Sequence, residues 1–251
     1  MSFDIVIPAR YASSRLPGKP LIYLDGMSLI ERVYHAACLS QAENVIIATD
    51  DERIKIEAER FGALVCMTSS EHASGTDRLA EVVDSMNIDS QKVLVNVQGD
   101  EPFIDPELID QLAELLLEDA ELNMSTACHV LDHRSKDGLE AVNNPNNVKV
   151  VVSDDDFALY FSRSPIPYLR QDSEEHCYYQ HMGIYAYRAG FITKFSSTPM
   201  ATLEQVESLE QLRVLQLGQR IKMLRYQGEP AIGIDTPEDV ELALKRLEAM
   251  G

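Results

Sequence analysis

In the first 120 residues of this 251-residue chain, short apolar runs alternate with amphipathic helical patterns, and this alternation limits the possible folds more than any other feature. Strands are predicted at residues 3–8, 44–49, 63–67 and 92–97, and helices at 28–40, 51–61, 78–86 and 105–117. Strands that stay apolar along their whole length are typical of a parallel sheet covered by helices on both faces. We therefore expect an α/β fold built around a central sheet.

The pattern changes after about residue 122, where strands follow one another with fewer helices between them. These strands are predicted at 124–130, 148–152, 158–162 and 182–188, and helices return at 204–217 and 237–249. Such a run of strands predicts a mixed sheet with a smaller β-rich subregion, which is a candidate subunit interface. Because no long linker or internal repeat interrupts the chain, we expect one domain over residues 1–251.

The charge balance excludes several classes of partner. The chain carries 22 Lys and Arg against 41 Asp and Glu, a formal charge of -19, so a general nucleic-acid or anionic-membrane surface is disfavoured. No apolar run approaches the roughly 20 residues of a membrane span. The start of the chain has no signal-like segment. The four cysteines are widely spaced, and we expect Cys38, Cys66 and Cys128 to be buried free thiols of a cytoplasmic protein.

Three cations gather directly after the first predicted strand: Arg10, Arg15 and Lys19. Ligands of α/β sheets bind where strands end, so these cations predict an anion site, most simply for a nucleotide triphosphate. The loop is not a Walker P-loop, because it lacks the G-x-x-x-x-G-K-[ST] pattern. The alternative interpretation is three solvated surface cations.

Two aspartates are candidate metal ligands. Asp100 follows the strand at 92–97, where a carboxylate and a bound polyphosphate would together suit Mg²⁺. A Gly-Asp turn is the structural alternative, although the neighbouring Gln98 favours a polar ligand. Asp235 precedes Thr236, a good N-cap with Asp239 at capping-box spacing. The cap does not explain Asp235 itself, which is a candidate second metal carboxylate.

Further segments are candidates for a substrate pocket. The loop at 70–77 is rich in small residues and opens a helix, so its N–H groups can approach a ligand. Arg78 is unfavourable in the first turn of that helix unless a carboxylate binds there, the alternative being an exposed arginine. His181, Gly183, Tyr185 and Tyr187 share one strand face, which lines either a polar pocket or an ordinary sheet. Asp154–Asp156 resembles a glycosyltransferase D-x-D motif but falls in a predicted hairpin turn.

Together, these segments closely resemble the 3-deoxy-manno-octulosonate cytidylyltransferase family. The matching motifs run in order across nearly the whole chain: IPARYASSRLPGKP at 7–20, SGTDRLAE at 74–81, NVQGDEP at 96–102, YFSR at 160–163, HMGIY at 181–185, LEQLR at 209–213 and DTPED at 235–239. A set of this length is far more specific than any one of its members.

The resemblance implies a nucleotide-diphosphosugar transferase fold (Rossmann-like), Mg²⁺ dependence, a homodimer, and the substrates CTP and an eight-carbon sugar acid. The anomeric hydroxyl of the sugar acid would attack the α-phosphate of CTP and release pyrophosphate. Nucleotide binding would fall in about residues 1–120, and sugar binding and dimerisation in about 121–235. By motif, Arg10, Arg15, Lys19 and Asp100 are the expected catalytic residues; Ala9, Arg10, Arg15, Lys19 and Ser74 would hold CTP; Asp100 and Asp235 would hold Mg²⁺; and Arg78, Gln98, Arg163, His181, Tyr185, Glu210 and Gln211 would line the sugar-acid pocket.

The chain departs from the usual pattern of this family at residues 129–144, 168–179 and 228–233. The acidic residues Asp172, Glu174 and Glu175 suggest that the sugar carries an ammonium, as in 8-amino-3,8-dideoxy-manno-octulosonate. Two competing functions are a related sugar nucleotidyltransferase, such as one that activates a sialic acid, and a nucleotide-sensing or structural module. A sensing module has little use for the paired Asp100 and Asp235.

Overall fold

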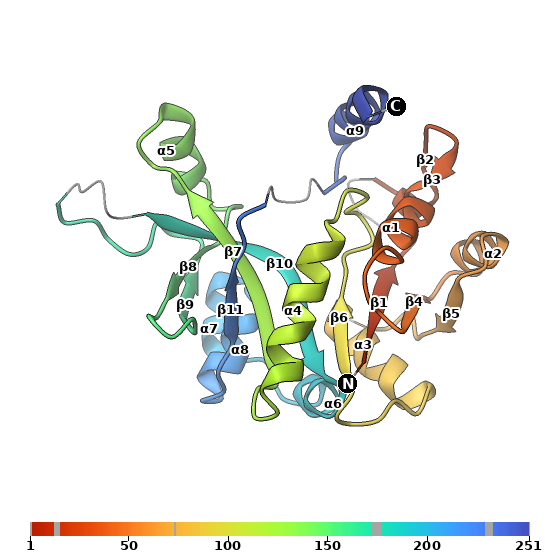
Figure 1. Cartoon of the computed structure of the whole chain (residues 1–251), viewed down its shortest axis with the longest axis horizontal. Helices are drawn as coiled ribbons and strands as arrows, with labels where there is room; N and C mark the ends of the chain where they lie inside the picture. Colours follow the sequence, from red (N-terminus) through yellow and green to blue (C-terminus); the bar gives the residue numbers. More distant parts are fainter. Residues whose placement is uncertain (1, 13–15, 73, 172–176, 229–232, 251) are drawn as a thin grey trace.

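A computed structural model describes residues 2–12, 16–72, 74–171, 177–228 and 233–250. Its main sheet runs in the order β11-β7-β10-β6-β1-β4-β5 (Figure 1). The bounds are β1 Phe3–Ala9, β4 Asn44–Thr49, β5 Leu64–Met67, β6 Val93–Asn96, β7 Met124–Leu131, β10 Tyr178–Arg188 and β11 Lys222–Arg225. Along this path, β10 pairs antiparallel with β6 and β7, while the pairings among the other described strands are parallel. The predicted mixed α/β sheet is thus confirmed.

The β-rich subregion is a hairpin of β8 (Lys149–Val152) and β9 (Ala158–Ser162). Strand β8 also pairs with β10 and so joins the hairpin to the main sheet. Its connecting turn contains Asp154–Asp156, as predicted. A separate two-stranded sheet joins β2 (Tyr23–Leu24) to β3 (Met27–Ser28). The short 3-10 helix η1 (Lys19–Leu21) precedes it and fixes the position of Lys19.

Helices cover both faces of the main sheet, because the side chains of each strand alternate between two cores. On β1, Ile5 and Ile7 join one core and Val6 joins the other. The first core takes side chains from α1 (Leu29–Ala37), α2 (Glu52–Arg60), α4 (Pro106–Glu118) and α9 (Pro237–Met250). The second takes them from α3 (Gly75–Ser85), α6 (Ala189–Ser196) and α8 (Gln211–Gln216). This layering leaves the ends of the strands open to ligands.

Several predicted elements differ in detail from the structure. The helix predicted at 78–86 begins at Gly75, because Ser74 and Asp77 form a capping box. The helix predicted at 204–217 is two helices, α7 (Thr202–Glu207) and α8, separated at Ser208, whose φ is 52°. The elements α5 (Lys136–Asn143), α6 and β11 were not predicted.

Two further predictions concern the burial of the cysteines and the absence of a membrane span. All four cysteines are free thiols, and Cys66 and Cys128 are buried as predicted. Cys38 is exposed, because it follows α1 at its C-terminal end, so the prediction of burial was wrong there. Within the described part of the chain, no helix combines the length and apolar character needed to cross a bilayer.

Candidate functional site

The candidate site lies where β1 and β6 end side by side, at the edge of the sheet nearest α9 (Figure 1). Gly99, in the loop after β6, packs so closely on β1 that an added Cβ would lie 2.7 Å from the carbonyl oxygen of Pro8. Only glycine allows that approach. The loops that follow the two strands are therefore held together, one carrying the predicted cations and the other carrying Asp100.

Lys19 joins both predicted metal carboxylates. Its Nζ donates to Oδ2 of Asp100 at 2.6 Å and to Oδ1 of Asp235 at 3.1 Å. The backbone N–H of Ile234 donates to the carbonyl of Asp100 at 2.9 Å, which draws the two acidic segments together. Burial disfavours the ammonium, but Asp100 and then Asp235 outweigh it, so the pKa of Lys19 is raised. The sequence predicted these three residues at one site but not their direct contact.

This pair of carboxylates fits a divalent cation. Both side chains already converge on one positive charge, which shows that their oxygens can share a cation. The described residues contain no cluster of three or more His, Cys, Asp or Glu side chains of metal-binding type. Mg²⁺ is often held by one or two carboxylates together with substrate phosphates, so two aspartates suffice if a nucleotide supplies the remaining oxygens.

A cavity of about 380 Å³ beside this cluster gathers most of the predicted nucleotide contacts. Arg10 reaches across it, where one terminal nitrogen donates to the carbonyls of His72 at 2.8 Å and Ser74 at 3.0 Å. Burial and the nearby Arg78 lower the pKa of Arg10. The predicted residues that line the cavity are Ala9, Arg10, Lys19, Gln98 and Asp100. Ser74 caps the adjoining helix α3, and Arg15 lies outside the described residues.

A second cavity, of about 170 Å³, shares Gln98 and Gly75 with the first. Four residues predicted to line the sugar-acid pocket meet here: Gln98, Tyr185, Glu210 and Gln211. Burial raises the pKa of Glu210, although a hydrogen bond from Thr76 opposes the shift. Burial also raises the pKa of Tyr185, with Glu210 adding to the effect. The cavity thus has buried polar groups in its lining, which suits a hydroxylated substrate.

His181 lies beyond Tyr185 on the same strand. Its ring is 5.3 Å from that of Tyr185 and 5.0 Å from that of Phe161, measured between centroids. Its Nε2 lies 3.0 Å from Oγ1 of Thr126, and burial lowers its pKa to about 3, so the imidazole is neutral. The ring contact between His181 and Tyr185 confirms the predicted shared face for these two residues, whereas Gly183 lies where the strand pairing is irregular.

Arg78 and Arg163 are held by the protein itself. Arg78 is fully buried, where one terminal nitrogen lies 3.2 Å from Oδ2 of Asp50 and another donates to Oγ1 of Thr68. Arg163 donates to the carbonyl oxygens of Glu207 at 2.7 Å, Pro145 at 3.0 Å and Ser208 at 3.2 Å. Neither lines the cavities around Gln98 among the described residues. Their sugar contacts stay predictions.

Sequence reasoning missed Glu101, which lines a third cavity of about 150 Å³ together with His181. Burial, and then the charge of Asp100, raise the pKa of Glu101 to about 7. Its position in the sequence, directly after the candidate metal ligand Asp100, was the feature that could have indicated a role for Glu101. The acidic residues Asp172, Glu174 and Glu175 lie outside the described residues.

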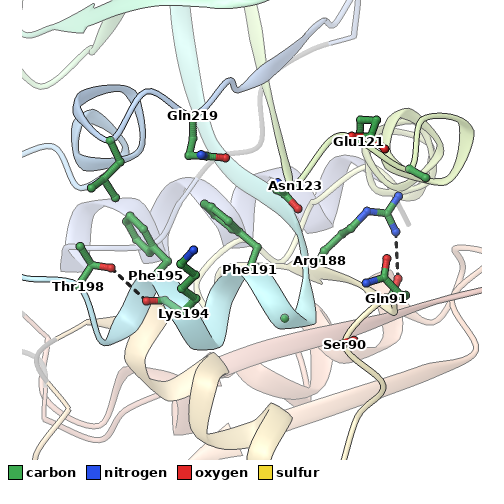
Figure 2. A pocket seen from close by; sticks show the side chains of 13 residues that line it. Ser90, Gln91, Glu121, Asn123, Arg188, Phe191, Lys194, Phe195, Thr198 and Gln219 are labelled. Carbon is green, nitrogen blue, oxygen red and sulfur yellow. Dashed lines mark hydrogen bonds between the residues drawn. The ribbon is translucent and has the colours of Figure 1, made fainter.

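A larger cavity, about 590 Å³, is at the opposite end of the sheet, where α6 follows β10 (Figure 2). Phe191, Lys194 and Phe195 line it from α6. Arg188 is fixed there by the backbone carbonyls of Gln91, Leu116, Asp119 and Leu122. No predicted site residue in the described part of the chain lines this cavity. Volume alone therefore does not mark the site.

Comparisons with known proteins show the family to which the chain belongs. A family model described as cytidylyltransferase matches residues 5–221. The chain is 49% identical over 255 residues to a 3-deoxy-manno-octulosonate cytidylyltransferase of Idiomarina loihiensis, with 98% of each covered. A protein of that name from Vibrio campbellii is 49% identical over 247 residues, with 96% of each covered. The solved structure of CMP:2-keto-3-deoxy-manno-octonic acid synthetase complexed with CTP superposes with a TM-score of 0.91 at 40% identity over 100% of both chains.

The fold is thus that of a nucleotidyltransferase. The chain belongs to the 3-deoxy-manno-octulosonate cytidylyltransferase family.

Proposed function

We propose that the protein transfers CMP from CTP to the anomeric hydroxyl of 3-deoxy-manno-octulosonate (Kdo), releases pyrophosphate, and so activates the sugar for lipopolysaccharide synthesis. The observation that carries the proposal is the convergence of Lys19, Asp100 and Asp235 beside the 380 Å³ cavity, which shares Gln98 and Gly75 with the second polar cavity. A relative of 40% identity binds CTP on the same fold, which supports CTP as the nucleotide.

The cationic side of the site neutralises the phosphates. Transfer at phosphorus depends mainly on positioning and charge neutralisation. Arg10 is held by two backbone carbonyls, so its guanidinium is fixed before the nucleotide arrives. Lys19 lines the same cavity, where phosphate oxygens would offer its ammonium new partners. We assign Arg15, by motif, to the same triphosphate.

Asp100 and Asp235 would hold Mg²⁺ together with the phosphates of CTP. When bound, Mg²⁺ would neutralise charge at the α-phosphate and lower the pKa of the attacking hydroxyl. The carboxylates hold this position because Gly99 packs on β1 and because Ile234 donates to the backbone of Asp100. No dedicated protein base is then required.

The sugar acid would enter the cavity formed by Gln98, Tyr185, Glu210 and Gln211. Gln98 lines both this cavity and the nucleotide cavity, and its Nε2 donates to the carbonyl of Gly183 at 3.2 Å. An amide fixed at that junction can orient the acceptor hydroxyl toward the α-phosphate.

The direct test is pyrophosphate release by the purified protein with CTP, Mg²⁺ and Kdo. We expect turnover that requires all three components and falls sharply when UTP replaces CTP. A sialic acid should not substitute for Kdo. Turnover with the sialic acid alone would indicate the related sugar nucleotidyltransferase, and binding of CTP without any turnover would indicate a nucleotide-sensing module.

A second experiment compares Kdo with its 8-amino analogue as the acceptor. We take Kdo as the acceptor because the family relatives are named for it. The ratio of kcat/KM for Kdo and for its 8-amino analogue measures the preference. A higher value for the 8-amino sugar would replace Kdo in the proposal.

We also propose that the protein acts as a homodimer in the cytoplasm. The β8–β9 hairpin projects from the main sheet and is the candidate dimer surface (Figure 1). Light scattering during size-exclusion chromatography should give twice the 28.1 kDa chain mass. A mass of one chain would contradict the dimer.

A further inference from the structure

The loop between β5 and α3 contains the two carbonyl groups that hold Arg10. They belong to His72 and Ser74, and both accept from the same terminal nitrogen of the guanidinium. Residues 69–71 of this loop are exposed, so burial contributes little to fixing its course. Polar contacts must therefore determine where the two carbonyls lie.

Glu81 supplies such contacts from helix α3. One oxygen of its carboxylate, Oε2, accepts from the backbone N–H of Ser69 at 2.8 Å and also hydrogen-bonds to Nε2 of His72. Burial disfavours the ionised carboxylate, but the hydrogen bonds from these two residues outweigh that effect, so the pKa of Glu81 is lowered. A single charged oxygen on a regular helix thus holds both ends of the segment from Ser69 to His72.

Arg10 depends on the loop carbonyls because of its surroundings. It is partly buried near the guanidinium of Arg78, and burial followed by that charge lowers its pKa. Asp50 and Asp77 offset these effects only in part, since the pKa of Arg10 stays below its ordinary value. If the loop moved, Arg10 would lose both hydrogen bonds, and we would expect its guanidinium to turn away from Arg78 toward water.

The side chains of His72 and Glu81 act at a distance from the nucleotide. Arg10 lines the 380 Å³ cavity proposed for CTP, whereas neither of these two is among the described residues that line it. Their side chains are 21% and 32% exposed, so a substitution removes a contact without opening a core. Any effect that they have on CTP must therefore pass through the loop and Arg10.

We propose that His72 and Glu81 are positioning residues for nucleotide binding, because their contact fixes the loop whose carbonyls direct Arg10 at the phosphates of CTP. The inference rests on the proposed function, which assigns Arg10 to the phosphates. It extends that function to two residues outside the described lining of the cavity.

The test measures the dissociation constant for CTP by calorimetry, without the sugar acid. His72→Ala and Glu81→Ala should each raise it about 3- to 10-fold, the size expected when a long side chain must be ordered during binding. His72→Gln should stay within about twofold of the wild type, because its amide nitrogen can donate to Glu81 from much the same position as Nε2 of the imidazole. This rescue keeps the inference testable if Glu81→Ala fails to fold.

The Arg10→Ala background separates positioning from general damage. A residue that acts only through Arg10 has nothing left to position there, so adding His72→Ala should change the dissociation constant by less than about twofold. Titrating CTP to millimolar concentrations keeps this weaker binding measurable. In turnover assays with Kdo, His72→Ala should raise the KM for CTP by a factor similar to its effect on binding and leave the KM for Kdo within about twofold.

A matched control removes a different histidine that faces a glutamate. His35 lies 3.9 Å from Glu31 on α1, so His35→Ala should leave the dissociation constant for CTP unchanged. An unchanged constant in His72→Ala would overturn the inference. An equal loss in His72→Gln, or a loss that persists in the Arg10→Ala background, would overturn it as well.

Failure of the proposed function gives a different result. If the wild type binds CTP but does not turn over Kdo, the proposed function fails, while the dissociation constants still decide the role of His72 and Glu81. If the wild type does not bind CTP, both fall together.

Discussion

At the scale of single residues, the ammonium group of Lys19 is the positive charge that contacts both carboxylates of the site, Asp100 and Asp235. Replacing Lys19 with Met removes the ammonium that contacts Asp100 and Asp235 and leaves two carboxylates facing each other. We expect the KM for CTP to rise about tenfold or more, since charge-assisted hydrogen bonds contribute about 1.5–3 kcal/mol. Initial rates at varied CTP test this. Lys194→Met, in the distant cavity, is the matched control, and an unchanged KM in Lys19→Met would argue against phosphate binding.

Asp100 should be required for turnover but not for folding. Asp100→Ala removes one of the two proposed Mg²⁺ ligands, while Gly99 and the backbone contact with Ile234 stay in place. We expect the rate of pyrophosphate release to fall by more than about 100-fold, with a similar midpoint of thermal unfolding. Near-normal rates at saturating Mg²⁺ would remove Asp100 from the metal site.

His181 should make the free energy of unfolding depend on pH. Its pKa is about 3 in the folded state because of burial, and near 6.5 when unfolded, so the unfolded chain binds more protons between these values. Stability should therefore fall as pH drops below 6.5, by about 1.4 kcal/mol for each unit, or about 2 kcal/mol at pH 5. Urea unfolding of the wild type and His181→Gln from pH 7 to 5 isolates the effect. Parallel curves for the two proteins would contradict it.

Residue types after the strands β1 and β6 predicted a common site for Arg10, Lys19 and Asp100, and Asp235 was added because the helix cap at Thr236 did not explain it. The direct contacts were not predictable, because Lys19 and Asp235 are 216 residues apart and no local pattern reports their distance. Arg78 shows the same limit. Its position in a first helical turn suggested a ligand, but the structure supplies Asp50 from the end of β4.

At the scale of elements, the irregularity in β10 depends on one hydroxyl group. Gly183 and Ile184 have no partners in the register between β10 and β7. Oγ1 of Thr126 lies 3.2 Å from the carbonyl of Met182 and 2.7 Å from that of Ile184, and so holds this bulge. The bulge in turn places the carbonyl of Gly183 against Gln98.

Thr126→Val keeps the shape of the side chain but removes that hydrogen bond. We expect the free energy of unfolding to fall by about 1–3 kcal/mol, because buried carbonyls lose a donor. Thr193→Val is the control, since its hydroxyl only contacts the carbonyl of Ala189 in its own helix, and it should cost about 0.5 kcal/mol or less. Equal losses in the two variants, measured by urea unfolding, would show that Thr126 has no special role.

Long helices and strands with clear capping residues could be predicted from the sequence, whereas several short ones could not. The helix predicted at 28–40 is α1, and Ser28 and Glu31 form the capping box that begins it. The break at Ser208 was missed, since a non-glycine residue with φ of 52° carries no sequence signal. The strand β11 has only four residues, with two apolar side chains between Lys222 and Arg225, so no period-two pattern marks it and its partner β7 determines its conformation.

At the scale of the whole molecule, the net charge of -19 opposes folding while the site attracts an anion. Added salt screens both effects. Raising NaCl from about 20 to about 200 mM should therefore raise the midpoint of thermal unfolding and, at the same time, raise the KM for CTP. Calorimetry and initial rates at the two concentrations test the pair of shifts. A midpoint that falls with salt would show that attractive charge pairs dominate the surface.

The order of the strands was the part of the architecture that the sequence did not reveal. The apolar runs predicted which segments are strands, and the helices between them predicted parallel neighbours. The position of β10 between β6 and β7 depends on pairing between distant segments, which propensity and periodicity do not report.

The position of β10 between β6 and β7 means that the sheet cannot be completed until late in synthesis. Until the ribosome has made Tyr178–Arg188, β6 and β7 each lack the neighbour that joins them in the finished sheet. Unpaired strand edges can pair with the edges of other growing chains. Because long-range strand pairing is slow, the edges of β6 and β7 stay exposed for longer. The large negative charge gives such chains mutual repulsion during that interval. The acidity that sets the cationic site apart thus also protects the protein while it is being made.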